Sequence, residues 1–437
     1  MSETLEQLRE EFQYAKTNQC VQCGYCLPVC PTYVTMGKET HSPRGRINLI
    51  KMVGEGRITD LSILENPLDL CLGCRACETA CPTGVEYGAI LESARAALNR
   101  RRNESETTQM LKRIFLRKVF PSRSAMRMIG HGMWIYQKSG LQKWAHKVGL
   151  TDKLPYHLGA FEATLSDPVS PKERTMLPNR VPAKGTRQYT VAFFTGCIMD
   201  AMFQRINRLS IQLLAEAGCD VIVVEEQTCC GALHAHAGEV DQSKDLAKRN
   251  IAAFEQEPVD FVVNNAGGCG AMLSEYGHLF QNDPEWHDRA LKFAAKTKDI
   301  SQILALCGGI PVNRTTQQEA PGERVTYQPS CHMTNVQKVT KEPLDLLKSI
   351  PGIDFQPMTE ANMCCGSAGI YNIVNYEESM TILDRKMEHA KDTKASVIVT
   401  TNPGCLIQMK LGIEREKLEN VRAVHLIEYL AEAAGIV

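Results

Sequence analysis

Two short cysteine runs with identical spacing constrain this chain more than any other feature. The first is Cys20-x-x-Cys23-x-x-Cys26-x-x-x-Cys30-Pro31, and the second is Cys71-x-x-Cys74-x-x-Cys77-x-x-x-Cys81-Pro82. Three thiolates at this spacing wrap one face of a cubane [4Fe–4S] cluster, and the fourth cysteine of each run reaches the neighbouring cluster. The spacing therefore predicts two clusters. One has the ligands Cys20, Cys23, Cys26 and Cys81, and the other has the ligands Cys71, Cys74, Cys77 and Cys30.

Zinc is the main alternative metal for these cysteines, because Cys-x-x-Cys pairs also suit tetrahedral coordination. Zinc sites rarely use a triple run that ends in Cys-Pro, so the runs favour iron. The proline ends each loop, since it fixes φ and removes a backbone donor. Between the runs, Arg44 and Arg46 either lie near the clusters, where they would raise the reduction potential, or form surface or interdomain ion pairs.

A second cysteine pattern occurs twice in the C-terminal half. Cys197, Cys229-Cys230-Gly231 and Cys269 recur between 134 and 136 residues later as Cys331, Cys364-Cys365-Gly366 and Cys405. The glycine lets the backbone turn sharply around a bulky inorganic group. Each copy therefore offers four thiolates, a complete ligand set for one more [4Fe–4S] cluster, so one or two further clusters are expected. A zinc site or a structural relic is the alternative in either copy.

Each copy also alternates apolar strands with helices of period 3.6. Strands are predicted at 190–196, 220–226, 260–266, 324–330, 353–358 and 396–402, and helices at 207–218, 244–255, 342–350 and 377–390. Continuous apolar strands between helices imply parallel α/β units. The repeat cysteines then fall at or just beyond the C-terminal ends of strands, where open α/β sheets place their ligands.

These patterns divide the chain into four parts. We expect a helical, ferredoxin-like domain with two clusters at 1–98, and a basic helical connector and linker without cysteines at 99–186. The first Cys-Cys-Gly domain follows at 187–310 and the second at 311–437. The predicted fold class is therefore mixed, α+β and α/β, and a chain of 437 residues is long enough for several buried cores.

The repeat motifs resemble those of a known family. They are TGCIMD (195–200), CCGALH (229–234), NAGGCG (265–270), CCGSAGIYN (364–372) and NPGC (402–405). They look like the Cys-Cys-Gly domains of heterodisulfide reductases, of anaerobic glycerol-3-phosphate dehydrogenase subunits and of glycolate and lactate oxidation systems. Behind a double ferredoxin domain, they make essentially the whole chain similar to the glycolate oxidase iron–sulfur subunits.

The resemblance implies a function and a set of partners. It implies an electron-transfer subunit of a glycolate or lactate dehydrogenase complex, with FAD on separate oxidase subunits of a hetero-oligomer. The electrons would pass to a quinone or another carrier. The sequence departs from one part of this resemblance. Heterodisulfide reductases with non-cubane clusters use a Cys-x-x-Cys ending, whereas this sequence has Met272 and Gln408 at the corresponding positions. Reduction of a disulfide or quinone at a repeat cluster is therefore the second hypothesis.

Motifs for a substrate-oxidising cofactor are missing from the sequence. No Gly-x-Gly-x-x-Gly follows a predicted strand, and neither a P-loop nor a nucleophile elbow is present. A 2-hydroxy acid loses two electrons as a hydride, whereas a cubane cluster accepts one electron at a time, so a flavin must stand upstream. We therefore expect no catalytic residues and no substrate oxidation by this chain alone.

Five further residues lie near these patterns or outside them. Cys219 and Cys307 belong to neither pattern, and we expect them to be small buried apolar residues. His234, His236 and His332 lie beside predicted ligands, where a histidine either tunes a cluster through hydrogen bonds or is structural. The structural role is favoured for all three.

Charge and hydropathy bound the partners and the location. A formal net charge of −1 and 6% aromatic residues favour no nucleic-acid surface. No stretch approaches about 18 uninterrupted apolar residues, and the acidic N-terminus is unlike a secretory signal, so we expect a cytoplasmic chain that does not span a membrane. Cysteines in a reducing compartment bind metal rather than form disulfides.

The connector is the exception to this neutral balance. Its first half interleaves basic residues with apolar ones, namely Arg113, Arg117, Lys118, Arg123 and Arg127 with Ile114, Phe115, Leu116, Met126, Met128 and Trp134. Such a mixture suits peripheral contact with an anionic membrane surface near the quinone pool. Packing on the other domains or on a partner subunit is the alternative.

Overall fold

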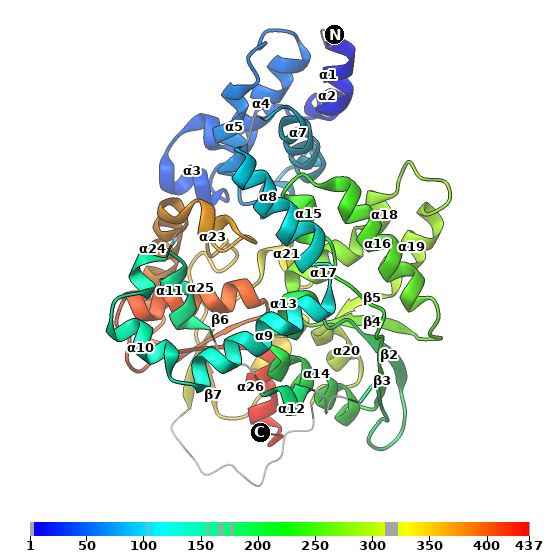
Figure 1. The fold of residues 1–437 in the computed structure, drawn as a ribbon, viewed down its shortest axis with the longest axis vertical. Helices are drawn as coiled ribbons and strands as arrows, with labels where there is room; N and C mark the ends of the chain where they lie inside the picture. The colour runs from blue at the N-terminus through cyan, green and yellow to red at the C-terminus, as the bar shows by residue number, and fades with distance from the viewer. Residues whose placement is uncertain are drawn as a thin grey trace.

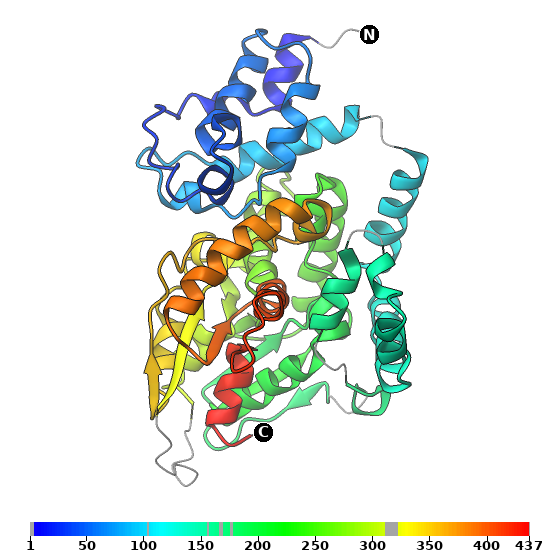
Figure 2. The ribbon, with the colours of Figure 1, turned by 90° about the vertical axis from the view of Figure 1, so that its left-hand side faces the viewer.

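The structure is a computed structural model, and it describes residues 4–102, 105–154, 157–165, 169–174, 178–310 and 322–436. An N-terminal group of helices lies at one end of the molecule, above two sheets that are covered by helices (Figures 1 and 2). None of the helices in these ranges is both long and apolar enough to cross a membrane.

The N-terminal part is entirely helical where it is described. Its helices are α1 (Leu5–Glu11), α2 (Tyr14–Thr17), α3 (Pro31–Met36), η1 (Glu39–His41), α4 (Pro43–Gly54), α5 (Ser62–Asp69), α6 (Ala76–Thr79) and α7 (Tyr87–Arg101). A core that includes Phe12, Ile50, Leu64 and Ile90 joins them, and each of these side chains is fully buried. Helix α3 begins at the proline that directly follows Cys30, where a fixed φ and a missing donor cost nothing. The first cysteine loop therefore ends as its sequence predicts.

The first sheet has the strand order β1-β3-β2-β4-β5. Its strands are β1 (Arg180–Val181), β2 (Tyr189–Phe193), β3 (Cys219–Val223), β4 (Phe261–Asn264) and β5 (Thr297–Asp299). All pairs are parallel except that of β1 with β3. The helices around it are α13 (Cys197–Met202), α14 (Gln204–Glu216), α15 (Ala232–His236), α16 (Val240–Phe254), α17 (Gly267–Ser274), α18 (Tyr276–Leu279), α19 (His287–Lys296) and α20 (Ile300–Leu306).

The second sheet has the strand order β7-β6-β8-β9, and all its pairs are parallel. Its strands are β6 (Glu323–Gln328), β7 (Ile353–Phe355), β8 (Val397–Thr400) and β9 (Arg422–His425). The helices are α21 (Cys331–Asn335), α22 (Glu342–Lys348), α23 (Tyr371–Val374), α24 (Tyr376–Asp392), α25 (Pro403–Arg415) and α26 (Leu426–Ala433). This order repeats that of the four parallel strands in the first sheet. The predicted duplication of a parallel α/β unit is therefore confirmed.

The sequence missed one parallel strand in each copy, β5 and β9. Both contain charged residues and no continuous apolar run, with the sequences Thr-Lys-Asp in β5 and Arg-Ala-Val-His in β9. Such segments lack the apolar pattern of a buried parallel strand, and they become strands because a neighbouring parallel edge offers hydrogen-bond partners. The two copies also share one apolar core, in which Leu213 and Leu214 of α14 belong with Leu426 and Leu430 of α26.

The connector forms its own layer along one side of the sheets, coloured cyan to green in Figure 2. Its elements are α8 (Glu106–Ile114), the π turn η2 (Phe115–Val119), α9 (Arg123–Lys138), α10 (Leu141–Lys147), η3 (Thr151–Lys153), α11 (Leu158–Thr164) and α12 (Pro171–Arg174). Helix α9 packs on α13 of the first copy, and α11 packs on α25 of the second. The connector therefore spans both copies, and its end supplies the edge strand β1.

Candidate iron–sulfur sites

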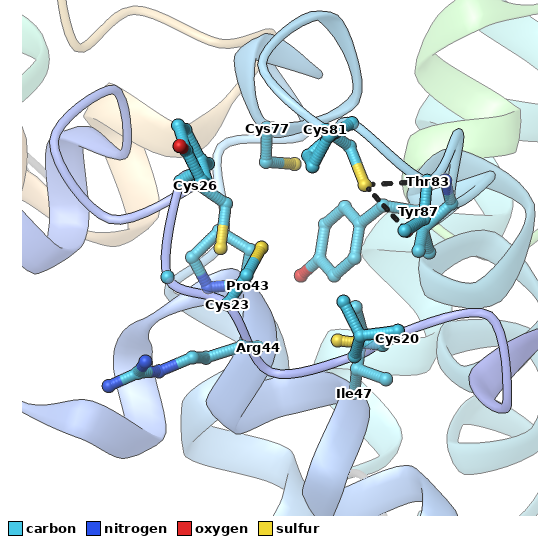
Figure 3. A pocket seen from close by; sticks show the side chains of 15 residues that line it. Cys20, Cys23, Cys26, Pro43, Arg44, Ile47, Cys77, Cys81, Thr83 and Tyr87 are labelled. Carbon is cyan, nitrogen blue, oxygen red and sulfur yellow. Dashed lines mark hydrogen bonds between the residues drawn. The ribbon is translucent and has the colours of Figure 1, made fainter.

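The first cysteine loop and Cys81 surround one space. Cys20, Cys23, Cys26 and Cys81 line a pocket together with Cys77, and Figure 3 shows these side chains around it. The cavity opens to solvent where Cys23 is exposed. The structure thus brings together the four cysteines of the first predicted ligand set.

The second cysteine loop and Cys30 surround a neighbouring space. Cys30, Cys71, Cys74 and Cys77 line this second pocket. All four are buried. The fourth cysteine of each run lies with the first three of the other, which is the exchange that the spacing predicts. Tyr87 lines both cavities and is 3% exposed, so its ring lies between them.

Left-handed backbone conformations shape both loops. The residues that flank the middle cysteine have positive φ, namely Gln22 (+59°) and Gly24 (+88°) in the first loop and Gly73 (+64°) and Arg75 (+58°) in the second. Alternation of left-handed and right-handed residues turns successive N–H groups toward one concave side, which suits a negatively charged group. In each loop only one of the two left-handed positions is a glycine, Gly24 or Gly73, which adopts a positive φ at little cost.

Hydrogen bonds aim at the sulfur atoms of the second set and of Cys81. The Gly73 N–H and the Tyr87 hydroxyl each donate to Cys71 Sγ at 3.4 Å, and the Val85 N–H donates to Cys81 Sγ at 3.5 Å. Donors to sulfur stabilise added negative charge and so set the potential of a cluster. The surroundings of these thiols therefore fit an iron–sulfur group.

Charges around the second set also favour thiolates. Burial acts to raise the pKa of Cys71, but the guanidiniums of Arg46 and Arg95 outweigh it and leave that pKa below its usual value. Burial and the neighbouring thiols raise the pKa of Cys74 and of Cys77 well above the ordinary value. Bound metal cations reverse that effect, since a coordinating thiol is deprotonated outright. Cys74 and Cys77 therefore need bound metal cations in order to become thiolates.

The two arginines between the runs have different surroundings. Arg44 lines the first cavity at its open side, and its Nε lies 2.7 Å from Glu39 Oε1. Arg46 lines the second cavity with only 1% of its surface exposed, and donates to Pro67 O at 2.6 Å and to Thr32 Oγ1 at 3.1 Å. Arg46 thus brings a buried charge to the second set, whereas the charge of Arg44 is paired near solvent.

The two Cys-Cys-Gly loops have the same local geometry. Gly231 and Gly366 have φ of +91° and +93°. Each glycine carbonyl accepts a hydrogen bond from an equivalent serine, Ser243 at 3.2 Å and Ser379 at 2.9 Å. The duplication therefore extends to single hydrogen bonds.

The four cysteines of each copy also come together. Cys197 and Cys229 lie with their sulfurs 3.5 Å apart, and Cys331 and Cys364 with theirs 3.9 Å apart. Cys230 contacts Cys269, and Cys365 contacts Cys405. A disulfide has an S–S length of about 2.05 Å, so the cysteines of each copy are free thiols that lie in neighbouring pairs.

At the two positions where a Cys-x-x-Cys ending would have its second cysteine, this chain has other residues with roles in packing. Gln408 is fully buried, donates to Ser379 Oγ at 3.0 Å and accepts from Asn372 Nδ2 at 3.0 Å. Met272 is 9% exposed and belongs to the apolar core of the first copy. Neither position therefore supplies a fifth thiolate to its set.

The second ferredoxin set lies against the second Cys-Cys-Gly set. Cys74, Cys331 and Cys364 belong to one buried cluster together with Leu72 and Tyr371. Asn335, at the end of α21, donates to the Cys74 carbonyl at 3.0 Å and accepts from Thr79 Oγ1 at 3.0 Å. No sequence pattern predicts this contact, because its two sides are more than 250 residues apart.

A buried lysine beside the second Cys-Cys-Gly set was also missed. Lys386 is 1% exposed, and its Nζ donates to Glu360 O at 2.6 Å and to Ala361 O at 3.2 Å. Burial lowers its pKa to about 8, while Cys365 and Cys364 act in the opposite direction. A lysine in an amphipathic helix such as α24 is typical of an exposed face, so its spacing carried no signal.

The three histidines beside the predicted ligands and the two cysteines outside the patterns have different surroundings. His234 is buried and its Nε2 lies 2.6 Å from Leu116 O. The rings of His236 and His332 stack with centroids 5.1 Å apart, between the two copies. Cys219 is fully buried, as expected, but Cys307 is only partly buried, and their sulfurs are 3.7 Å apart.

The donor sets as a whole fit iron–sulfur clusters. Among the described residues, no three His, Cys, Asp or Glu side chains converge at the spacing of a single metal ion. The two ferredoxin sets surround neighbouring pockets and present thiols, hydrogen-bond donors and a buried arginine to them. Four soft thiolates around such a space are the ligands that a [4Fe–4S] cluster uses.

Comparison with known proteins covers most of the chain. Residues 16–85 match the family model of a 4Fe-4S dicluster domain, and residues 191–274 and 325–410 match that of a cysteine-rich domain. Residues 107–165 match the linker region of the glycolate oxidase iron-sulfur subunit. The cysteine-rich matches coincide with the two structural copies, and the linker match lies in the connector.

Individual relatives give the same result. The chain is 48% identical over 437 residues to a probable glycolate oxidase iron-sulfur subunit of Bacillus subtilis (strain 168), covering 100% of this chain and 98% of that protein. It is 29% identical over 389 residues to the glycolate oxidase iron-sulfur subunit of Escherichia coli (strain K12), with 88% of each covered. It is also 35% identical over 240 residues to lactate utilization protein A of Oceanobacillus iheyensis, which covers 55% of this chain and 96% of that protein.

Proposed function

The chain belongs to the family of glycolate oxidase iron–sulfur subunits, and from this premise we propose that it carries electrons within a glycolate or lactate dehydrogenase complex. Oxidation of a 2-hydroxy acid releases two electrons as a hydride, which FAD on the partner subunits accepts. Iron–sulfur clusters, when bound, take up and release electrons one at a time. The chain itself supplies thiolates, buried charges and the route between sites.

The proposed ligands are the sixteen cysteines of the two patterns. One ferredoxin cluster is held by Cys20, Cys23, Cys26 and Cys81, and the other by Cys71, Cys74, Cys77 and Cys30. The Cys-Cys-Gly sets are Cys197, Cys229, Cys230 and Cys269 in the first copy and Cys331, Cys364, Cys365 and Cys405 in the second. We place these sets in the proposed domains 1–98, 187–310 and 311–437.

One observation carries the proposal, the packing of Cys74 against Cys331 and Cys364. Tyr87 lies between the two ferredoxin cavities, and Cys74 joins the second cavity to the second Cys-Cys-Gly set. The stacked rings of His236 and His332 lie between the two copies. Because electron transfer weakens steeply with distance, a series of adjacent sites from the exposed Cys23 inward supports a carrier function.

The acceptor and the location are part of the proposal. We infer that the electrons go to a quinone or another carrier, and that the protein works in the cytoplasm, peripherally at the inner face of the membrane. The many free thiols suit a reducing compartment. A quinone dissolved in lipid would require a docking face on the complex.

The function is tested by reconstitution of the complex with anaerobically purified protein. Alone, the chain should not oxidise glycolate or lactate with any artificial acceptor. Mixed with its flavoprotein partners, it should be reduced by the substrate, which is seen as bleaching of its visible absorbance. Cys74→Ser should leave the flavin reducible and stop passage to the final acceptor. Turnover by the isolated, FAD-free chain would contradict the carrier function and favour catalysis at a Cys-Cys-Gly site.

The ligand sets are tested by metal analysis of the same preparation. Three or four [4Fe–4S] clusters correspond to roughly 12 to 16 iron atoms per chain. Cys364→Ser should remove about one cluster and leave the ferredoxin pair, whereas Cys219→Ser, outside the patterns, should leave the iron unchanged. Iron near eight atoms with one or two zinc atoms would show that the Cys-Cys-Gly copies bind zinc instead.

A further inference from the structure

The connector has a one-sided charge that the rest of the chain lacks. Between residues 107 and 151 the sequence contains nine Lys and Arg and no Asp or Glu, in a chain whose formal net charge is −1. Such a segment attracts an anionic surface over distances up to about a Debye length, roughly 8–10 Å at physiological salt.

Three of these cations attach the connector to the first Cys-Cys-Gly copy through ion pairs. Arg123 and Arg127 of α9 lie 3.4 and 2.9 Å from Asp200, which is 2% exposed, and Arg117 lies 3.6 Å from Glu239. Gly130 allows close packing, because a Cβ there would meet Ala201 O at 2.4 Å. This face of α9 is therefore occupied within the molecule. Three of the five cations that the sequence offered for membrane contact are therefore paired with acidic residues of the first copy.

The opposite side of the connector is apolar and exposed. On α9, Met128 and Ile135 are 67% and 55% exposed and stand seven residues apart, which places them on one face of the helix. On α10, Leu141, Trp144 and Val148 follow the i, i+3, i+7 spacing and are each at least half exposed. Their neighbour Ala145 is buried, so α10 packs inward with the side next to this stripe.

Exposed lysines border one edge of the apolar stripe of α10. Lys143 and Lys147 are both exposed and stand four residues apart, which places them together on one side of Trp144 on the helix surface. Lysine stems can lie along an apolar surface while their ammonium groups reach lipid phosphates, and tryptophan prefers the boundary between headgroups and acyl chains. Leu150 and Leu154 continue the exposed apolar surface beyond the helix.

We propose that this face binds the surface of an anionic lipid bilayer; we call it the α9–α10 face and define it by Met128, Ile135, Leu141, Lys143, Trp144, Lys147 and Val148. Charge complementarity decides for lipid, because cations without any acidic residue match a uniformly anionic surface, whereas protein partners usually present both signs. The side chains also follow two joined helices rather than line a pocket, which suits a flat surface. The inference deepens the proposed function in one respect only, since it would bring the complex to a lipid-borne quinone.

Vesicle flotation of the anaerobically purified full chain tests the proposal. The protein should float with vesicles of phosphatidylcholine and phosphatidylglycerol, and not with phosphatidylcholine alone. The double variant Lys143→Glu/Lys147→Glu should weaken partitioning about tenfold or more, since each basic residue near the surface contributes about 1 kcal/mol. Leu141→Ser/Trp144→Ser should weaken it as well, and Trp144→Phe should largely retain it.

Matched variants elsewhere on the surface serve as controls. Lys292→Glu on α19 and Leu306→Ser at the end of α20 change similarly exposed residues, and both should float like the unaltered protein. Iron content and circular dichroism show whether each variant is folded. Flotation that is independent of lipid charge, or equal in the face and control variants, would overturn the proposal and leave the α9–α10 face to a protein partner.

The same variants separate this inference from the proposed function. With a water-soluble dye as acceptor, substrate-dependent reduction through the flavoprotein partners needs no membrane and should be unchanged in Lys143→Glu/Lys147→Glu. Loss of flotation with full dye reduction would therefore support both ideas. Absence of flotation in the unaltered protein would overturn the lipid-binding face alone, and absence of dye reduction would overturn the carrier function alone.

Discussion

Single buried cations lie beside two of the cysteine sets and give each a distinct electrostatic surrounding. Arg46 faces the second ferredoxin cavity, and Lys386 faces the second Cys-Cys-Gly set. Arg46 is held by a backbone carbonyl and a hydroxyl, and no carboxylate among the described residues pairs with it, whereas Lys386 is held by backbone carbonyls and is also attracted by the carboxylate of Glu360. A buried, uncancelled positive charge stabilises the reduced, more negative state of a cluster.

Replacing Arg46 should therefore lower a reduction potential. For Arg46→Gln we expect a decrease on the order of 100 mV, since one charge at ~6–8 Å with an effective dielectric constant of ~20 contributes about 2–3 kcal/mol. Redox titration followed by electron paramagnetic resonance measures the shift. Arg44→Gln is the matched control, because Arg44 is paired with Glu39 near solvent, and it should shift the potential much less. Equal shifts in both variants would remove the role assigned to Arg46.

The two glycines of the Cys-Cys-Gly loops have equivalent conformations but different neighbours. A Cβ on Gly231 would first meet Ser243 Oγ at 2.8 Å, whereas a Cβ on Gly366 would first meet the backbone oxygen of Ser379 at 2.8 Å. A side-chain oxygen can be removed by substitution, and a backbone oxygen cannot. The two sites should therefore respond differently to the same pair of changes.

Gly231→Ala and Gly366→Ala should each destabilise the protein by about 1–3 kcal/mol through backbone strain and contact. Adding Ser243→Ala should recover part of the loss at Gly231, while Ser379→Ala should recover less at Gly366. Denaturant midpoints and iron content of the single and double variants measure this. Equal recovery at both sites would show that the strain of positive φ, and not the contact, sets the cost.

At the scale of elements, Asp200 is the residue that holds the connector to the first copy. It lies in α13, is 2% exposed and accepts hydrogen bonds from Arg123 and Arg127 of α9. Its own carbonyl accepts from Arg174 of α12. One short helix thus anchors two parts of the connector, and the outward orientation of the α9–α10 face depends on this anchor.

Asp200→Asn should loosen α9 and destabilise the protein by about 2–4 kcal/mol, because two guanidiniums lose their buried counter-charge. Limited proteolysis should then cut within 115–140 sooner than in the unaltered protein. Asp384→Asn removes an exposed pair with Arg415 and should cost less than about 0.5 kcal/mol. A proteolysis rate at the connector that is unchanged in Asp200→Asn would show that apolar packing alone holds α9.

At the scale of the whole molecule, the ferredoxin-like part docks on both copies through polar contacts. Arg75 pairs with Glu78 and with Glu275 of the first copy, and Lys338 of the second copy donates to Thr79 at 3.0 Å. Glu92 of α7 is near this group. Burial and the charge of Glu275 raise its pKa to about 7, while Arg75 and Arg95 act against them.

This raised pKa predicts a pH dependence of stability. Between about pH 4.5 and 7 the folded protein binds a proton at Glu92 that the unfolded chain releases, so the free energy of unfolding falls as the pH rises through this window. Glu92→Gln should remove that part of the fall and be on the order of 2–3 kcal/mol more stable than the unaltered protein at pH 8, relative to pH 5. Denaturant midpoints at the two pH values measure the difference.

Glu86→Gln is the control for Glu92→Gln, because the pKa of Glu86 is shifted in the opposite direction. Pairing with Lys16 lowers the pKa of Glu86, so its charge stabilises the folded state at higher pH and its removal should not stabilise the protein. A Glu92→Gln variant without any gain at pH 8 would show that the carboxylate is solvated or paired in the folded state.

The sequence by itself determined the local geometry of the cysteine sites. Ligand spacing within about ten residues sets which thiols can face one group, so the exchange of Cys30 and Cys81 between the two runs was predictable. The duplication at 134 to 136 residues predicted two equal parallel sheets, because strand and helix periodicities are local properties of the chain. Even the hydrogen bonds of Ser243 and Ser379 follow from this duplication.

Only the tertiary structure decided how these sites connect. The contact of Cys74 with Cys331 and Cys364, the burial of Lys386 and the inward pairing of Arg123 and Arg127 with Asp200 all join segments far apart in the chain. Periodicity states that a helix has an apolar side, but not which partner covers it. The same basic helices would have suited several environments, and the packing of whole faces chose among them, because the free energy of burial is a property of the assembled surfaces and not of the local sequence.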